Sequence, residues 1–188
     1  PAVYEALIAP LLARLQPKSL AVTRKDLRII DSTLIHPGAG AASWARFEDG
    51  LVGAKVHVVY DPAIEAPTYF EVTSGNTNDI TVAKSSIRIV PGATYVFDLG
   101  YYDYGFWADL DAAGCRLVTR LKKNTLVTVL GERPLGDDPT VLSDRIVRLP
   151  SRLARSRRNP FCQDGRIVEV RAQSGRILRV FTNDLTSS

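Results

Sequence analysis

Two short apolar runs, each with a lone aspartate, constrain this 188-residue chain more than any other feature. Residues 28–35 read Arg-Ile-Ile-Asp-Ser-Thr-Leu-Ile and carry Asp31, and residues 95–101 read Tyr-Val-Phe-Asp-Leu-Gly-Tyr and carry Asp98. Their β-branched and aromatic content predicts two strands, with the aspartate in or at the end of each. A carboxylate at the end of a buried strand is costly unless a cation meets it. If the strands are neighbours, the pair could hold a hard, oxygen-preferring ion such as Mg²⁺.

The composition allows one good core, or a core with an inserted subdomain, because 45% of the residues are hydrophobic and 23% are charged. The net charge of +4 is unevenly distributed. Residues 145–179 contain ten arginines against only two acidic residues, Asp164 and Glu169. Such a segment points to a phosphate-bearing partner. The alternative is a solvated, basic β surface.

Cysteine and histidine content excludes several kinds of site. Two cysteines far apart in sequence and two histidines argue against a disulfide framework, a zinc site and a histidine-rich metal site. The apolar stretch at residues 3–15 is interrupted by Glu5, Pro10 and Arg14, and it is too short and polar to span a bilayer. We therefore expect a cytoplasmic protein with no membrane contact. The chain contains no methionine, and we expect it to be a fragment.

The spacing of apolar residues predicts a mixed order of elements. Helices are expected at residues 3–15 and 80–90, and between a cap at Asp103 and a stop at Gly114. Strands are expected at residues 27–34, 51–60, 68–73, 93–99 and 115–121. Four more strands, with no helical period between them, are expected at residues 125–130, 145–149, 166–172 and 176–182. The order predicts an α/β fold with a mixed sheet and flanking helices, followed by a β-rich, arginine-rich segment.

Three stretches resemble the DDE transposases of bacterial insertion sequences, and most closely the insertion sequence 4 family. Residues 29–33 resemble the first-aspartate motif of that family, and residues 97–101 resemble the second. Residues 73–79, Thr-Ser-Gly-Asn-Thr-Asn-Asp, resemble the stretch between them. The resemblance covers roughly residues 27–185.

The resemblance implies an RNase H-like core that a β-rich insertion divides before the helix bearing a catalytic glutamate. It leads us to expect an N-terminal helix and connector at 1–26, the core at 27–123, the insertion subdomain at 124–178 and a truncated return strand at 179–188. The tyrosine-arginine-glutamate-lysine signature that carries the family's third carboxylate does not occur before Ser188. We expect that helix beyond the end of the chain. Glu132, expected in a turn, and Glu169, expected in a strand, are not assigned as its replacement.

The activity implied is DNA transposition, by metal-dependent cleavage and strand transfer at transposon ends. By likeness, Asp31 and Asp98 are the catalytic metal ligands, and the complete enzyme uses two Mg²⁺ or Mn²⁺ ions about 4 Å apart. Ser32 and Thr33 are expected to orient Asp31 through their hydroxyls. The other interpretation of both aspartates is that they form turns.

Basic residues are the expected contacts to DNA, since arginine pairs with phosphate in a bidentate manner. The expected DNA-binding residues are Arg152, Arg155, Arg157, Arg158, Lys122 and Lys123. A flexible charged loop between Pro150 and Pro160 is the alternative for the four arginines. His57 alternates with Val56 and Val58 and is expected at the surface or beside the site.

Two other functions remain open at this point. One is a catalytically inactive, DNA-binding remnant of a transposase, and the other is another RNase H-like nuclease, such as a junction resolvase. The expected partner is DNA, both transposon ends and target, with a homodimer possible on paired ends. We expect the truncated chain to be inactive alone.

Overall fold

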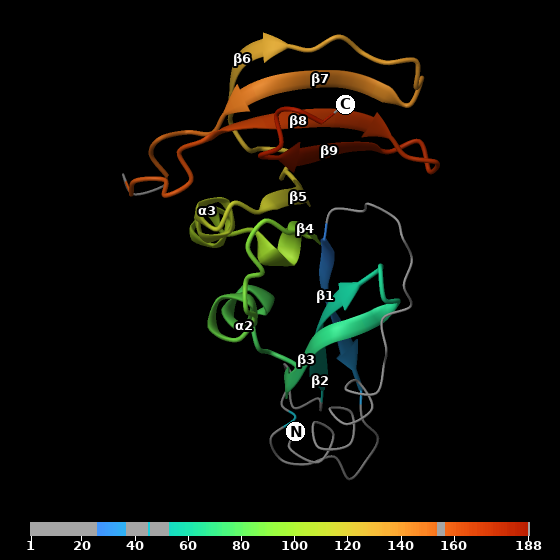
Figure 1. Cartoon of the computed structure of the whole chain (residues 1–188), viewed down its shortest axis with the longest axis vertical. Helices are drawn as coiled ribbons and strands as arrows, with labels where there is room; N and C mark the ends of the chain where they lie inside the picture. Colours follow the sequence, from blue (N-terminus) through green and yellow to red (C-terminus); the bar gives the residue numbers. More distant parts are fainter. Residues whose placement is uncertain (1–25, 37–44, 46–52, 154–156, 188) are drawn as a thin grey trace. The chain divides into compact units, whose positions relative to one another are not determined.

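The computed structural model describes residues 26–36, 45, 53–153 and 157–187. The chain forms two compact units, Pro1–Arg88 and Ile89–Ser188 (Figure 1). The helix predicted at residues 3–15 lies outside the described residues. Strands of both directions combined with helices confirm the predicted mixed α/β class. Within the described ranges, no helix has the length and apolar character needed to cross a membrane.

The first unit is built on three antiparallel strands in the order β3-β2-β1. These are β1 (Leu27–Ile35), β2 (Ala54–Asp61) and β3 (Ala66–Ser74), which confirm three of the predicted strands. Successive side chains in a strand point to opposite faces. Ser32 is paired with His57, and His57 with Glu71, so these three share one face. Asp31, paired with Val58, lies on the other face.

The helix of the first unit, α2 (Asp79–Ser85), is shorter than the predicted helix at residues 80–90. The backbone leaves the helix at Ser86, where φ is −124°. The Ser85 hydroxyl donates to the carbonyl of Thr81 at 2.9 Å, a local bond of the kind that competes with helix propagation. Ile87 is buried although it lies outside the helix. The apolar spacing beyond Ser85 therefore reflects burial of an extended segment.

The second unit begins with a parallel pair of strands joined through a helix. β4 (Thr94–Phe97) runs parallel to β5 (Arg116–Arg120), and α3 (Tyr104–Ala112) connects them after the 3₁₀ turn η2 (Leu99–Tyr101). The Asp103 carboxylate accepts from the backbone N–H of Phe106 at 2.8 Å, which confirms the predicted cap. Gly114 has a φ of 69° and ends the helix as predicted.

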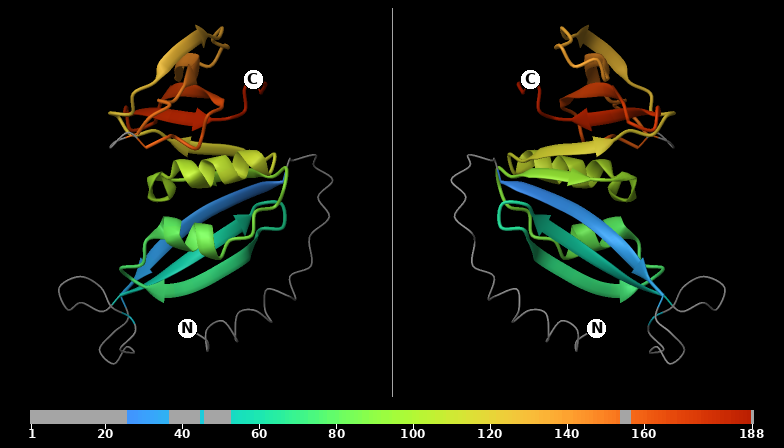
Figure 2. Two further views of the ribbon diagram at one scale, coloured as in Figure 1. Left: turned by 90° about the vertical axis from the view of Figure 1, so that its left-hand side faces the viewer. Right: turned by 90° about the vertical axis from the view of Figure 1, so that its right-hand side faces the viewer.

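Four further strands follow in antiparallel order, and all four confirm the predicted β-rich segment (Figure 2). They are β6 (Thr128–Glu132), β7 (Val141–Arg148), β8 (Asp164–Arg171) and β9 (Ile177–Thr182). β9 also pairs with β5, so the sheet of this unit runs β4-β5-β9-β8-β7-β6. Glu132 ends β6, paired with Arg145 of β7; the prediction that it lies in a turn is wrong.

An aromatic cluster forms the centre of the second unit. The Trp107 ring of α3 stacks on Phe181 of β9, with centroids 5.3 Å apart and planes at 19°. Phe161 lies edge-on to both rings, at 6.1 Å and 5.9 Å. All three side chains are buried, so the cluster belongs to the hydrophobic core of this unit. At Gly165 of β8, a Cβ atom would lie only 2.2 Å from the Phe181 ring.

Gly165→Ala should destabilise the second unit, because the added methyl overlaps a ring that is packed on Trp107. Overpacking of this kind costs about 1–3 kcal/mol. Urea unfolding of the variant measures the loss. Gly131→Ala is the matched control, since a Cβ atom added there would meet no other atom within 4 Å. Equal midpoints for the two variants would contradict this account of the cluster.

Candidate carboxylate site and basic surfaces

Asp31 occupies the middle of β1 and is exposed to solvent. β1 remains paired with β2 as far as Ile35 opposite Ala54, so the carboxylate is neither buried nor at the tip of its strand. Its Oδ1 accepts from the backbone N–H of Ser32 at 2.8 Å. The strand therefore holds the carboxylate by its backbone, and its other oxygen has no hydrogen bond to any residue that the structure describes.

Asp98 comes directly after β4 and is also exposed. Its Oδ1 accepts from the backbone N–H of Gly100 at 2.8 Å, so the residue caps the 3₁₀ turn that follows. Its carbonyl accepts from the Thr119 hydroxyl at 3.4 Å, which ties the turn to β5. Asp98 thus forms a turn, as one interpretation predicted, and still presents a carboxylate oxygen.

Asp31 and Asp98 have no counter-ion among the described residues, in contrast to the strand carboxylates Asp61 and Asp144. Asp61 pairs with Arg28 at 2.7 Å, and Asp144 pairs with Arg166 at 2.6 Å. Asp31 belongs to the first unit and Asp98 to the second. In the part of the chain that the structure describes, no three His, Cys, Asp or Glu side chains are arranged to hold a metal ion. Two open carboxylates are suitable donors for a hard cation but incomplete as a cage.

Of the two hydroxyl residues after Asp31, Ser32 does not act as predicted. Its hydroxyl donates to Asp79 Oδ1 at 2.9 Å, on the face of the sheet opposite Asp31. Only its backbone N–H contacts Asp31. The reason is strand alternation, which turns adjacent side chains to opposite faces. Thr33 shares the face of Asp31 and is exposed, and its role stays a prediction.

Ser32 instead belongs to a polar network that joins α2 to the sheet of the first unit. Lys55 Nζ lies 3.0 Å from Asp79 Oδ1 and donates to the carbonyl of Thr77 at 2.9 Å. His57 Nε2 lies 2.9 Å from the Thr73 hydroxyl. Two features of the sequence could have indicated this network. Lys55 and His57 alternate with apolar residues along their strand, and an acidic residue begins the helix α2.

His57 is fully buried within this network, so the prediction that it lies at the surface is wrong. The Thr73 hydroxyl also lies 3.2 Å from the carbonyl of Ser74. His57 Nδ1 has no hydrogen-bond partner among the described residues and lies 3.7 Å from Asp79 Oδ1. Burial lowers the pKa of His57 below its ordinary 6.5, with Lys55 acting in the same direction, although Asp79 and Glu71 raise it. The neutral ring is therefore the favoured form.

In the loop between β7 and β8, two segments pair in antiparallel fashion and present arginines; they are here called the arginine hairpin (residues 150–153 and 157–160). Arg152 and Arg158 form an antiparallel bridge, and the backbone N–H of Leu153 donates to the carbonyl of Arg157 at 2.7 Å. The buried Asn159 donates to the carbonyl of Pro150 at 3.0 Å. Arg152, Arg157 and Arg158 are exposed, and Arg155 lies outside the described residues.

Other arginines of the same segment serve the fold. Arg145 pairs with Glu169 at 2.9 Å, and Arg148 pairs with Asp164 at 2.7 Å. Glu169 also accepts from the Ser143 hydroxyl at 3.0 Å. The arginine-rich segment therefore contains both arginines held in ion pairs and exposed arginines, among them those of the arginine hairpin.

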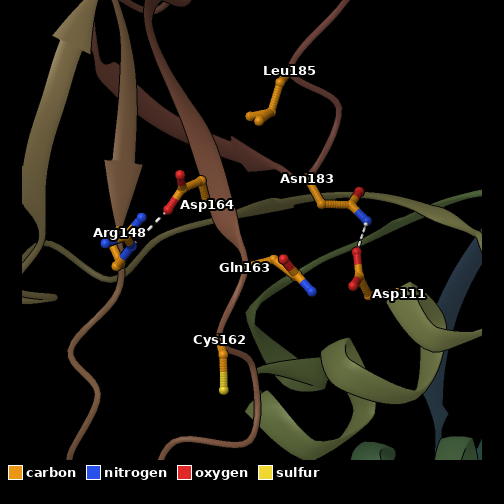
Figure 3. Close-up of a pocket in the computed structure, with 7 residues that line it drawn as sticks. All are labelled: Asp111, Arg148, Cys162, Gln163, Asp164, Asn183 and Leu185. Atoms are coloured by element: carbon orange, nitrogen blue, oxygen red, sulfur yellow. Dashed lines mark hydrogen bonds and ion pairs between the residues drawn. The ribbon is translucent and has the colours of Figure 1, made fainter.

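Two pockets of the second unit differ in charge. In the first, of about 320 Å³, Arg148 is paired with Asp164, and Asn183 is hydrogen-bonded to Asp111 at 2.8 Å (Figure 3). The second, of about 390 Å³, is named the basic pocket. It is lined by Leu99, Arg120, Leu121, Lys122, Lys123, Glu169, Arg176, Ile177, Leu178 and Arg179. Both lysines expected to bind DNA lie in the basic pocket.

Comparison with known proteins identifies the family. Residues 23–185 match the family of the transposase DDE domain. The chain is 35% identical over 187 residues to y4zB, a protein of Sinorhizobium fredii named as a transposase, covering 97% of this chain and 51% of that protein. It is 28% identical over 128 residues to the transposase of insertion sequence element IS231E of Bacillus thuringiensis subsp. finitimus, covering 63% of this chain and 26% of the relative.

A solved structure shares the fold. It is a piggyBac transposase synaptic complex with hairpin DNA, which matches with a TM-score of 0.50 and 10% identity, over 88% of this chain and 34% of that chain. The likeness is consistent with the predicted RNase H-like core. The chain belongs to the DDE transposase domain family. It spans about half the length of the first of these relatives and about a quarter of the second.

His57→Gln should reduce the loss of stability on acidification. Because the folded-state pKa lies below the unfolded value of about 6.5, the unfolded chain binds the extra proton first as pH falls. The wild type should therefore lose stability as the pH drops below about 6.5, and the variant should lose less. Melting temperatures of both proteins at about pH 7.5 and about pH 5.5, on either side of that value, measure the difference. Identical losses would show that His57 is not the group responsible.

Proposed function

We propose that this chain carries the catalytic carboxylates of a DDE transposase that cleaves DNA at transposon ends and transfers the strands. The observation that supports it most is the pair Asp31 and Asp98. Each is exposed, lies in a motif that resembles the family's, and has no counter-ion among the described residues. By family likeness, the first aspartate of such a core lies on the first strand and the second just after the fourth; Asp31 is on β1 and Asp98 follows β4.

Asp31 and Asp98 together hold the divalent ions, Mg²⁺ or Mn²⁺, and this joint use is part of the proposal. When bound, two such ions activate a water or a 3′-hydroxyl and stabilise the leaving oxygen. The donor set fits a hard ion, since both groups offer only oxygen. Glu169 is unsuited to complete the set, because Arg145 and Ser143 already hold its carboxylate. The third ligand of the family, a glutamate on a helix, is not assigned to any described residue of this chain.

The arginine hairpin is the proposed contact to DNA backbone phosphates. Its exposed guanidinium groups project from a paired frame anchored at Asn159. Lys122 and Lys123 are proposed as further contacts. Membership of the insertion sequence 4 family, a homodimer on paired ends and a cytoplasmic location stay predictions.

A DNA-binding remnant without catalysis is the second candidate, since the exposed arginines of the arginine hairpin would serve DNA binding without the two aspartates. The two candidates differ in metal binding. An active core needs Asp31 and Asp98 as metal ligands, whereas a remnant without catalysis does not need either residue to bind a metal ion.

Asp31→Asn and Asp98→Asn should each weaken Mn²⁺ binding by this chain by about tenfold, the lower end of the losses seen when a metal site is disturbed. Binding to the wild type should itself be weak, because Mg²⁺-type sites rely on substrate phosphates and waters as well. Calorimetric titration with Mn²⁺ measures the affinities. Asp109→Asn, at an exposed carboxylate of α3, is the matched control. Tight binding that ignores both substitutions would refute the site.

Removing two charges from the arginine hairpin should flatten the salt dependence of DNA binding. Each lost phosphate contact lowers the slope of log K against log[salt] by about 0.9. The double variant Arg157→Ala, Arg158→Ala is compared with the wild type by fluorescence anisotropy on a short labelled duplex at several KCl concentrations. Arg148→Ala, which removes a charge already paired with Asp164, is the control. A slope equal to that of the wild type would reject the contact.

A further inference from the structure

The basic pocket concentrates positive charge that the second unit does not neutralise. Five cationic residues line it, namely Arg120, Lys122, Lys123, Arg176 and Arg179, against a single carboxylate, Glu169. In a concave site, charges of one sign reinforce one another and attract a counter-ion. The pocket is thus chemically suited to an anion.

The one carboxylate of the pocket is already occupied. Glu169 Oε1 lies 2.9 Å from Arg145 and 3.6 Å from Nε of Arg179, which stands directly opposite it on β9. Its Oε2 accepts from Ser143. Glu169 therefore compensates the two arginines of the sheet and leaves Lys122, Lys123 and Arg176 without a carboxylate partner among the described residues.

The backbone that carries the two lysines is fixed in place. The guanidinium of Arg179 donates to the carbonyls of Lys122 and Lys123 at 3.3 Å and 3.1 Å. The backbone N–H of Leu121 donates to the carbonyl of Arg179 at 2.9 Å. Lys122 Nζ lies 4.7 Å from the centre of the Tyr102 ring, a cation–π contact. A site ordered in advance loses less conformational entropy when a ligand binds.

The pocket also borders one of the candidate catalytic residues. Leu99, which lines it, is the residue directly after Asp98. Both belong to the second unit, and the Asp98 carbonyl is tied to Thr119 one residue before Arg120. An anion in the basic pocket would therefore lie beside the turn that presents the Asp98 carboxylate.

We propose that the basic pocket binds a backbone phosphate of DNA. The phosphate belongs to the strand whose cleaved phosphodiester bond lies at Asp98. The proposal rests on the proposed function and adds Arg176 to the DNA contacts. Its recognition is independent of sequence, because the cations meet phosphate and not base edges. Arg176 and Lys123 contact the phosphate, and Arg179 positions the loop that carries Lys123.

The double variant Lys123→Ala, Arg176→Ala tests the proposal, since neither side chain holds the fold by an ion pair among the described residues. Binding of a short fluorescein-labelled duplex is followed by anisotropy over a series of KCl concentrations. The salt slope should fall by about 1.8, from two lost phosphate contacts. Arg148→Ala is again the control, because it removes a cation that lies in the other pocket. A double-variant slope equal to that of the control overturns the proposal.

A second measurement locates the contact. Amide chemical shifts of the chain are recorded by NMR with and without the duplex. Shifts at residues 122–124 and 176–179 support the basic pocket, whereas shifts confined to the arginine hairpin overturn it. Phosphatidylserine vesicles are the competing surface, and vesicles that displace DNA at equal charge also overturn the proposal.

Failure of this inference and failure of the proposed function are separable by the Mn²⁺ titration. If Mn²⁺ binding depends on Asp31 and Asp98 but the pocket variant keeps the wild-type salt slope, only the pocket assignment is wrong. If the pocket variant loses slope but Mn²⁺ binding ignores both aspartates, the pocket stands as a phosphate site and the catalytic assignment fails.

Discussion

The compensation of charge determines which polar side chains of this chain hold the fold together and which are open to ligands. A charge taken out of water is costly unless an opposite charge and hydrogen bonds replace its solvation. Asp144 is buried and meets Arg166 through two hydrogen bonds, and Asp79 meets Lys55. Asp31 and Asp98 avoid the cost by lying at the surface, which leaves their oxygens open to a cation.

The aromatic cluster supports the basic surfaces of the second unit. Trp107 stacks on Phe181, and Phe161 packs against both rings directly after the arginine hairpin. The strand β9 carries both Phe181 and Arg179. Two exposed basic regions are thus attached to one buried core.

Much of the fold could be predicted because its signals are local. Strands show a period of two, and the capping aspartate at 103 and the glycine at 114 mark the ends of α3. The predictions failed where packing decides. The helix α2 ends before its apolar pattern does, and His57 is buried beneath a helix that begins 22 residues later. The sequence shows that one face of a strand is polar, but it does not show which helix or strand will cover that face.

Residue types and their spacing were sufficient to establish the α/β class, the family and the two aspartate motifs, because these properties are carried along the chain. Which side chains are free was settled only by folding in three dimensions. Folding directed the Ser32 hydroxyl to Asp79, matched Glu169 to Arg145, and gathered Lys122, Lys123 and Arg176 into one pocket. These outcomes depend on residues far apart in the chain meeting across a sheet, and a charge is neutralised only by what lies beside it in space.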